Sequence, residues 1–411
     1  MVTPLRIRPP RVMTLLGPAF VAAIAYIDPG NVAANLSAGS TYGYALVWVL
    51  VVSSLIALVV QYLSARLGIV TGRSLAGLVT DRLAERHKVW RVAYASQAFV
   101  MAVATDLAEV IGGALGLHLL FRVPLWLGGL IVGVGTLVLL PILRSRGEIV
   151  FERAVAGVAV LIAVAFLAGL VWAPPDPLAT LAGLLPTVPD RAAWALAAAM
   201  LGATVMPHAI YLHSALAVER YHSDGRPVAS VDRLLRIQRI DVVAALALAG
   251  SVNIAMLLYA AAALRGLSGD TINDAHRMLG STLGPVAAAF LGAGLLASGV
   301  GSAVVGTHAG SGIAADVLPT KVNPMVTRAL TIAPAVLLLV GGIPATAVLV
   351  TSQIVLSFGI GFAVAPLALL SSRESVMGAW RITGALRVAA WAVVVIVVAL
   401  NLVLLATWLV P

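Results

Sequence analysis

The segment Asp28-Pro29-Gly30-Asn31 places a carboxylate and a carboxamide beside a helix breaker, inside an apolar stretch that spans residues 12–40. Proline lacks a backbone N–H and disfavours helical geometry in the residue before it, so we expect the helix to unwind at Pro29 and Gly30. In a membrane, unwound backbone is tolerated only where protein buries it or where it lines a cavity. Its free carbonyls, with the side-chain oxygens of Asp28 and Asn31, would form a donor set for a cation. The alternative is an ordinary proline kink, with the Asp28 side chain reaching a membrane surface.

A second interruption, Met206-Pro207-His208, lies within the apolar residues 192–219. We expect a second helix break at Pro207. A thioether binds soft and borderline metal ions and contributes little to Mg²⁺ or Ca²⁺ binding, so Met206 favours Mn²⁺, Fe²⁺, Co²⁺ or Cd²⁺. A lone methionine in an apolar span is usually core packing, and here its position beside the break favours a ligand role. His208 is a candidate for lining the same cavity and relaying protons.

Several titratable side chains lie inside apolar spans and could carry protons. Asp106 and Glu109 are three residues apart and therefore share one face of a helix. Two neighbouring carboxylates cannot both ionise cheaply in a low dielectric, so one of them can hold a proton near neutral pH. We expect Asp28 to release its proton when metal binds and to pass it toward this pair; the alternative is a structural pair neutralised by arginine or by hydrogen bonds. His213 lies about 140° around the helix from His208, so the two cannot both face the site.

The composition indicates that lipid surrounds these residues. Of 411 residues, 61% are hydrophobic and only 10% are charged, and the mean hydropathy is +1.04. A membrane-crossing helix needs roughly 20 mostly apolar residues. The sequence offers eleven such spans, at residues 12–40, 44–70, 91–120, 124–143, 149–172, 192–219, 236–264, 284–317, 324–342, 344–371 and 385–410. We therefore expect an all-α polytopic membrane protein of eleven transmembrane helices, preceded by a basic tail at residues 1–11.

The distribution of basic residues predicts the orientation. Most of the 26 Lys and Arg side chains fall on the N-terminal side of the membrane, and the exceptions are Arg122, Arg191, Arg265 and Arg277. The positive-inside rule then places the N-terminus in the cytoplasm and the C-terminus outside a bacterial plasma membrane. The basic residues are scattered over separate membrane edges instead of one folded face, which argues against nucleic-acid binding.

The sequence lacks the residues and motifs that several classes of enzyme and pump require. There is no cysteine, hence no thiolate metal site and no thiol nucleophile. Neither a His-Glu-x-x-His motif nor a Walker loop is present, so zinc hydrolysis and ATP-driven pumping have no support within this chain. The remaining alternatives are a sodium- or proton-coupled amino-acid symporter, a membrane enzyme that uses the buried carboxylates, and a transporter tuned to Mg²⁺. Asp28 would repel a substrate carboxylate, and Met206 argues against Mg²⁺.

The two interruptions resemble the paired signatures of the Nramp family of proton-coupled divalent metal transporters. Similarity runs from about residue 16 to residue 370 and includes Ala104-Thr105-Asp106-Leu107-Ala108-Glu109, Gly306-Thr307-His308-Ala309-Gly310 and Ser352-Gln353. The resemblance implies a LeuT-like inverted repeat, with helices one to five in residues 12–172 and helices six to ten in residues 192–371. Residues 385–410 would form an added eleventh helix.

The resemblance also implies the function and the ligands. The chain would be a secondary transporter, not an enzyme, importing Mn²⁺ or Fe²⁺, and also Cd²⁺ or Co²⁺, together with protons. It would need no cofactor and no obligatory protein partner. The implied metal ligands are Asp28, Asn31 and Met206, the backbone carbonyls of Ala25 and Ala203, and Gln353 in some states of the cycle.

Two positions depart from the family pattern. Gly361 stands where family members often have a proline, so gating by helix ten would differ. The basic pair found in helix nine of some relatives is represented here by Arg328 alone, which leaves its part in a proton pathway open.

Overall fold

The computed structural model describes residues 17–84, 88–145, 148–266, 271–282, 284–317 and 324–409. The predicted basic tail, residues 1–11, lies outside them. The described chain is helical almost throughout, apart from one antiparallel hairpin in which His222 pairs with Pro227 and Ser223 pairs with Arg226. The all-α prediction is therefore confirmed.

The elements up to the second helix break are α1 (Pro18–Ile24), the 3-10 turn η2 (Ala25–Ile27), α2 (Pro29–Tyr42), α3 (Val47–Thr71), α4 (Leu75–Ala84), α5 (Lys88–Phe121), α6 (Leu125–Ser145), α7 (Glu148–Trp172), α8 (Pro177–Ala182) and α9 (Arg191–Thr204). Those that follow are α10 (Pro207–Tyr221), β1 (His222–Ser223), β2 (Arg226–Pro227), α11 (Val231–Ala263), α12 (Thr271–Thr282), α13 (Pro285–Val317), α14 (Pro324–Val340), α15 (Ala345–Ser372), α16 (Glu374–Met377), η3 (Gly378–Trp380) and α17 (Gly384–Leu409).

The helices correspond closely to the predicted spans. Among the described residues, 7 helices are long and apolar enough to cross a membrane. Shorter apolar helices occupy Pro18–Ile27, Leu125–Leu139 and Ala329–Val340, within the predicted first, fourth and ninth spans. The protein is thus a multi-pass membrane protein, while the number eleven remains a prediction.

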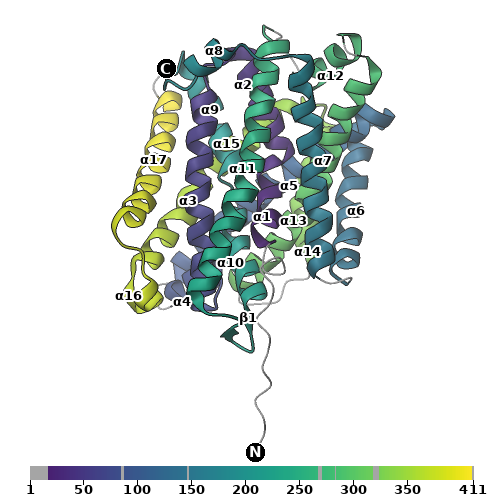
Figure 1. Cartoon of the computed structure of the whole chain (residues 1–411). Coiled ribbons are helices and arrows are strands. Elements are labelled where there is room, and N and C mark those ends of the chain that lie inside the picture. Colours follow the sequence, from purple (N-terminus) through teal and green to yellow (C-terminus); the bar gives the residue numbers. More distant parts are fainter. Residues whose placement is uncertain are drawn as a thin grey trace, which may run out of the picture.

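Four short helices among the described residues were not predicted from the sequence. They are α4, α8, α12 and α16, which connect longer helices and lie at the ends of the bundle (Figure 1). Hydropathy does not reveal them because each is too short to span a bilayer. In α12, the polar side chains of Asp274 and Arg277 form an ion pair.

The long helices form a bundle that runs between two ends (Figure 1). α1 begins in the half of the bundle that lies toward α4, β1 and α16, whereas α17 finishes at the opposite end, near α8. A chain that starts at one face and finishes at the other crosses an odd number of times. This arrangement agrees with the odd number of spans in the sequence.

Close backbone contact defines the centre of the bundle. α5 packs along α13, and a Cβ atom built on Gly299 would lie 2.4 Å from the backbone nitrogen of Gly113. Glycine is required at such a crossing because helix association in lipid relies on tight backbone approach. By contrast, α17 lies at the periphery and exposes a stripe of apolar side chains at seven-residue spacing, namely Val388, Val395, Leu402 and Leu409. Such a stripe suits contact with lipid.

Candidate metal site

The two helix breaks have the same local construction. Asp28 precedes α2, Met206 precedes α10, and each second helix begins with a proline. Both preceding residues have extended backbone, with φ −72° and ψ 168° at Asp28 and φ −70° and ψ 128° at Met206. Proline causes this because it disfavours helical geometry in the residue before it and fits the first position of a new helix. The predicted breaks at Pro29 and Pro207 are confirmed.

Hydrogen bonds join the first break to the second. Asp28 Oδ1 accepts from the backbone N–H of Asn31 at 2.8 Å and from Asn31 Nδ2 at 2.8 Å. The same Nδ2 donates to the carbonyl of Ala203, also at 2.8 Å. The Asn31 side chain therefore connects α2 to the C-terminal end of α9, although the two residues are 172 positions apart. Carbonyls at such a helix end carry partial negative charge and suit a cation.

Gln353 reaches the same place from α15. A Cβ atom built on Gly30 would lie 1.9 Å from Gln353 Nε2, so the glutamine side chain occupies the space that the glycine leaves free. A Cβ atom on Gly202 would lie 2.0 Å from the Gln353 backbone oxygen. Gln353 is thus held against both broken helices, and the structure brings it together with Asp28 and Asn31.

Three oxygen atoms in this cluster are buried without a hydrogen-bond partner: Asp28 Oδ2, Asn31 Oδ1 and Gln353 Oε1. An unsatisfied buried polar group costs about 1–3 kcal/mol, and more if it is charged. Several such oxygens in one place are expected where a cation binds. The described residues contain no cluster of three or more His, Cys, Asp or Glu side chains that could hold a metal. The donor set therefore rests on one carboxylate, two amides and the neighbouring thioether.

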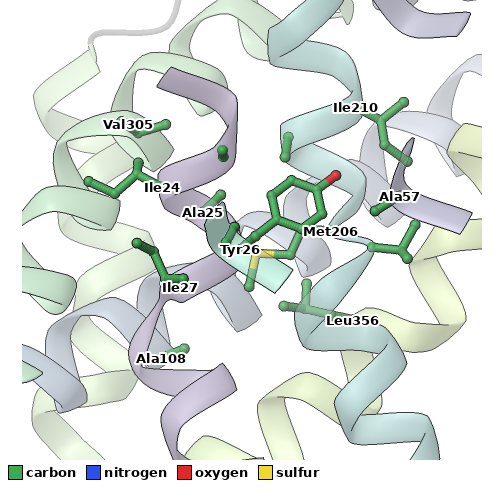
Figure 2. Packing of buried hydrophobic residues seen from close by; sticks show 14 of the residues in the cluster. Ile24, Ala25, Tyr26, Ile27, Ala57, Ala108, Met206, Ile210, Val305 and Leu356 are labelled. Atoms are coloured by element: carbon green, nitrogen blue, oxygen red, sulfur yellow. The ribbon is translucent and has the colours of Figure 1, made fainter. Parts of the chain in front are cut away.

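Met206 supplies that thioether. Its side chain reaches from the start of α10 toward Tyr26 and Ala25 of the unwound segment (Figure 2), and all three belong to one buried cluster. Asp28, Asn31, Met206 and Gln353 each expose 1% or less of their surface. The site is consequently closed to water on both sides in this structure.

His208 connects the site to α5. Its Nδ1 lies 3.1 Å from Thr105 Oγ1, and the adjacent residue, Asp106, is also buried. Glu109 is buried one turn further along α5, with its carboxylate against Gly306 of α13.

The same helix packs directly on the first break. A Cβ atom on Gly112 would lie 2.0 Å from Pro29 Cβ. The helix that carries Asp106 and Glu109, and that contacts His208 through Thr105, therefore packs against the first break at Pro29.

The other two predicted proton-pathway residues lie elsewhere. His213 Nδ1 is 2.6 Å from Gln61 Oε1, and His213 Nε2 is 3.0 Å from Gln238 Nε2. Gln61 also bonds the Tyr26 hydroxyl, so His213 belongs to a second polar chain between α3, α10 and α11. Arg328 falls in α14, but its side chain lies outside the described residues.

Two residues that contact the first break escaped the prediction of the site. Asn253 Nδ2 donates to the Tyr26 carbonyl at 2.8 Å, and Ser298 Oγ donates to the Ile27 carbonyl at 2.6 Å. Asn253 is an amide deep in an apolar span, a pattern that is typical of an interhelical hydrogen bond. Ser298 gave no signal, because serine is common in membrane helices.

Polar contacts at the two ends of the bundle fix the site helices. Asp241 of α11 accepts from the backbone N–H of Ala19 at 3.0 Å and so caps α1. At the opposite end, the Tyr42 hydroxyl donates to Asp190 at 2.7 Å, and Asp190 also caps α9 by accepting from the N–H of Ala193. The Tyr42 hydrogen bond is the main reason that the pKa of Asp190 lies below its ordinary value.

Comparisons with known proteins agree with this geometry. The model of the Nramp family, described as natural resistance-associated macrophage protein-like, matches residues 19–407. The divalent metal cation transporter MntH of Mycobacterium tuberculosis is 48% identical over 394 residues, which cover 95% of this chain and 91% of that protein. MntH of Bacillus subtilis is 41% identical over 396 residues, covering 96% and 92%.

A solved structure extends the likeness to three dimensions. The crystal structure of a variant of the Eremococcus coleocola manganese transporter has 25% sequence identity and a TM-score of 0.83, covering 95% of this chain and 86% of that one. The helical architecture and the paired breaks match a LeuT-like fold. The chain belongs to the Nramp family and is a multi-pass membrane transporter, not an enzyme.

Proposed function

We propose that this chain imports divalent transition-metal ions, Mn²⁺ or Fe²⁺ by preference, with Co²⁺ and Cd²⁺ also accepted, together with protons. The observation that carries the proposal is the convergence of three unpartnered buried oxygens, from Asp28, Asn31 and Gln353, on the breaks of two helices beside Met206. The names of its relatives, divalent metal cation transporter and manganese transporter, support the same class of cargo.

The donor set supports transition metals over hard ions. Asp28 supplies the formal charge, the carboxamide oxygens of Asn31 and Gln353 supply neutral oxygens, and Met206 supplies a polarisable sulfur. Mn²⁺ and Fe²⁺ accept such a mixture, whereas Mg²⁺ and Ca²⁺ gain little from a thioether. The carbonyls of Ala25 and Ala203 complete the proposed ligand set.

Proton movement is proposed to begin at Asp28. A divalent cation favours the ionised carboxylate, so metal binding would expel a proton from Asp28. His208 of α10, hydrogen-bonded to Thr105, and the buried carboxylates of Asp106 and Glu109 on α5 are the proposed proton acceptors. His213 and Arg328 are proposed to act further along the route.

The proposed orientation and location rest on the sequence. Basic residues concentrate on the N-terminal side, which supports a cytoplasmic N-terminus, an extracytoplasmic C-terminus and a bacterial plasma membrane. Because the site is closed on both sides, import requires it to open first outward and then inward.

Proteoliposomes that contain a pH-sensitive dye test the proposal. Mn²⁺ added outside should enter saturably and acidify the lumen, and Asp28→Asn should abolish both signals. Glu109→Gln should leave Mn²⁺ entry present and reduce the acidification. Asp274→Asn is the matched control, because Asp274 lies on the short helix α12, away from the site, and pairs with Arg277. Mn²⁺ entry that persists at the full rate in Asp28→Asn would refute the assigned site, and absence of Mn²⁺ flux in the unmodified protein would favour the amino-acid symporter.

A further inference from the structure

The carbonyl groups of the first helix break are not all available to an ion. η2 contains Ala25, Tyr26 and Ile27, and the last two have carbonyls that already accept side-chain hydrogen bonds. The donors are Asn253 on α11 and Ser298 on α13, at 2.8 Å and 2.6 Å respectively. Of the three η2 carbonyls, that of Ala25 is the one that no side chain of the described residues contacts as a donor, so it is the one we assign as a ligand.

The amide of Asn253 is oriented by a second contact. Asn35 Nδ2 donates to Asn253 Oδ1 at 3.2 Å, which leaves the Asn253 amino group to face the Tyr26 carbonyl. Asn253 and Ser298 are both almost completely buried, with exposed fractions of 1% and 0%. Hydrogen bonds in such surroundings are not exchanged for water, and loss of the donor leaves a carbonyl unsatisfied at a cost of about 1–3 kcal/mol.

We propose that Asn253 and Ser298 determine metal specificity by holding two hard oxygen donors away from the ion. This inference rests on the proposed function and assigns a role to residues outside the ligand set. With the carbonyls of Tyr26 and Ile27 engaged, the ion meets only the oxygens of the proposed ligand set and one thioether, an arrangement that suits a transition metal. Ca²⁺ needs 6–8 oxygen ligands in flexible geometry, and the two freed carbonyls would bring the number of available oxygens into that range.

The two residues also fix the position of the break. α11 and α13 both pack against η2, so each hydrogen bond joins the unwound segment to a long helix that does not itself break there. Asp28 follows Ile27 directly, and the Ser298 bond therefore sets where its carboxylate stands. Outer-shell partners of this kind typically change metal affinity by about 10–100-fold when they are removed.

The chain offers matched variants for a test. Ser298→Ala removes the donor to Ile27, whereas Ser298→Thr keeps a hydroxyl at the same position. Ser302→Ala is the control on the same helix, because within the described residues the Ser302 hydroxyl donates to its own helix, at the Gly299 carbonyl. Asn253→Leu keeps a side chain that branches at Cγ but has no hydrogen-bond donor, so it frees the Tyr26 carbonyl.

Binding of Mn²⁺ and of Ca²⁺ to each purified protein is measured by isothermal titration calorimetry, alongside uptake of both ions into proteoliposomes. We expect the ratio of Mn²⁺ to Ca²⁺ affinity to fall by about tenfold in Ser298→Ala and in Asn253→Leu. The ratio should be kept in Ser298→Thr and Ser302→Ala. Ca²⁺ uptake should rise above that of the unmodified protein in the two variants that lose a donor.

Two outcomes would overturn the inference. If the affinities for Mn²⁺ and Ca²⁺ fall by the same factor, the two residues only support the fold. If neither affinity changes, the freed carbonyls do not reach the ion. If Asn253→Leu does not fold, the pair Ser298→Ala and Ser298→Thr decides the question. Failure of the unmodified protein to bind Mn²⁺ at all would instead count against the proposed function.

Discussion

Replacing Gly202 with alanine tests whether α9 and α15 must touch for the site to exist. A Cβ atom at Gly202 would lie 2.0 Å from the backbone oxygen of Gln353 and 2.9 Å from the backbone nitrogen of Ser357. Both obstacles are backbone atoms, which cannot rotate aside. Because ordinary contacts begin at 3.4 Å, the two helices would have to separate by about 1.4 Å.

That separation exceeds what a metal site tolerates. Metal–ligand distances hold within about 0.2 Å, and Gln353 would move away from Ala203 and Met206 as α15 shifts. Overpacking a tight core costs about 1–3 kcal/mol. If that strain destabilises the closed state, in which the ligands lie close together, Mn²⁺ affinity should fall by about 5- to 150-fold.

Gly361→Ala is the matched control for Gly202→Ala. Gly361 lies on α15, in helical geometry, and a Cβ atom there would meet nothing within 4 Å. This variant should bind Mn²⁺ like the unmodified protein, and helix propensity predicts a small gain in stability, of up to about 1 kcal/mol.

Calorimetric titration with MnCl₂ measures the affinity, and thermal unfolding in detergent checks that each variant is folded. Folded Gly202→Ala protein that binds Mn²⁺ within twofold of the unmodified affinity would refute the reasoning. If Gly202→Ala does not fold, Gly30→Ala replaces it. Its Cβ atom would displace only the Gln353 side chain, so loss of Mn²⁺ affinity should follow without loss of the fold.

Three further predictions concern single side chains. Met206→Leu keeps the volume but removes the thioether, so tracer uptake should show weaker Mn²⁺ transport and new Ca²⁺ or Mg²⁺ passage; unchanged selectivity would exclude a ligand role. Asp241→Leu leaves the N–H groups at the start of α1, including that of Ala19, without an acceptor, and the thermal midpoint should fall by the equivalent of about 1–3 kcal/mol; an unchanged midpoint would contradict this. The lowered pKa of Asp190 means that its bond from Tyr42 stabilises the fold above the ordinary aspartate range and is lost as pH falls below about 4, so Asp190→Asn should lessen that acid sensitivity in a pH series of unfolding curves; identical pH profiles would disprove it.

The helix breaks could be predicted because their causes are local. Pro29 and Pro207 each restrict the residue before them, whatever the rest of the chain does, and the structure shows extended backbone at Asp28 and Met206. The apolar spans could be predicted equally well, since a bilayer imposes a minimum length and a composition on each helix. The short helix α12 could not be predicted, because a polar segment outside the membrane is under no such constraint.

The ligands of the candidate site could be named only in part from their chemistry. Asp28, Asn31 and Met206 attract attention by their positions beside the breaks, whereas Gln353 and the Ala203 carbonyl were expected from the family resemblance alone. In the structure, the space left by Gly30 admits the Gln353 side chain. Sequence spacing does not reveal such a meeting, because residues 30 and 353 are distant along the chain and only helix packing brings them together.

The sequence by itself determined a polytopic helical membrane protein with two proline-broken helices and the donor atoms next to each break. These follow from local backbone sterics and from the solvent that the composition requires. Only the tertiary structure decided which donors meet and which are held away. The Asn31 amide bridges to Ala203, and the carbonyls of Tyr26 and Ile27 are taken by Asn253 and Ser298. Hydrogen bonds between helices depend on distance and direction in space, which chain order does not fix.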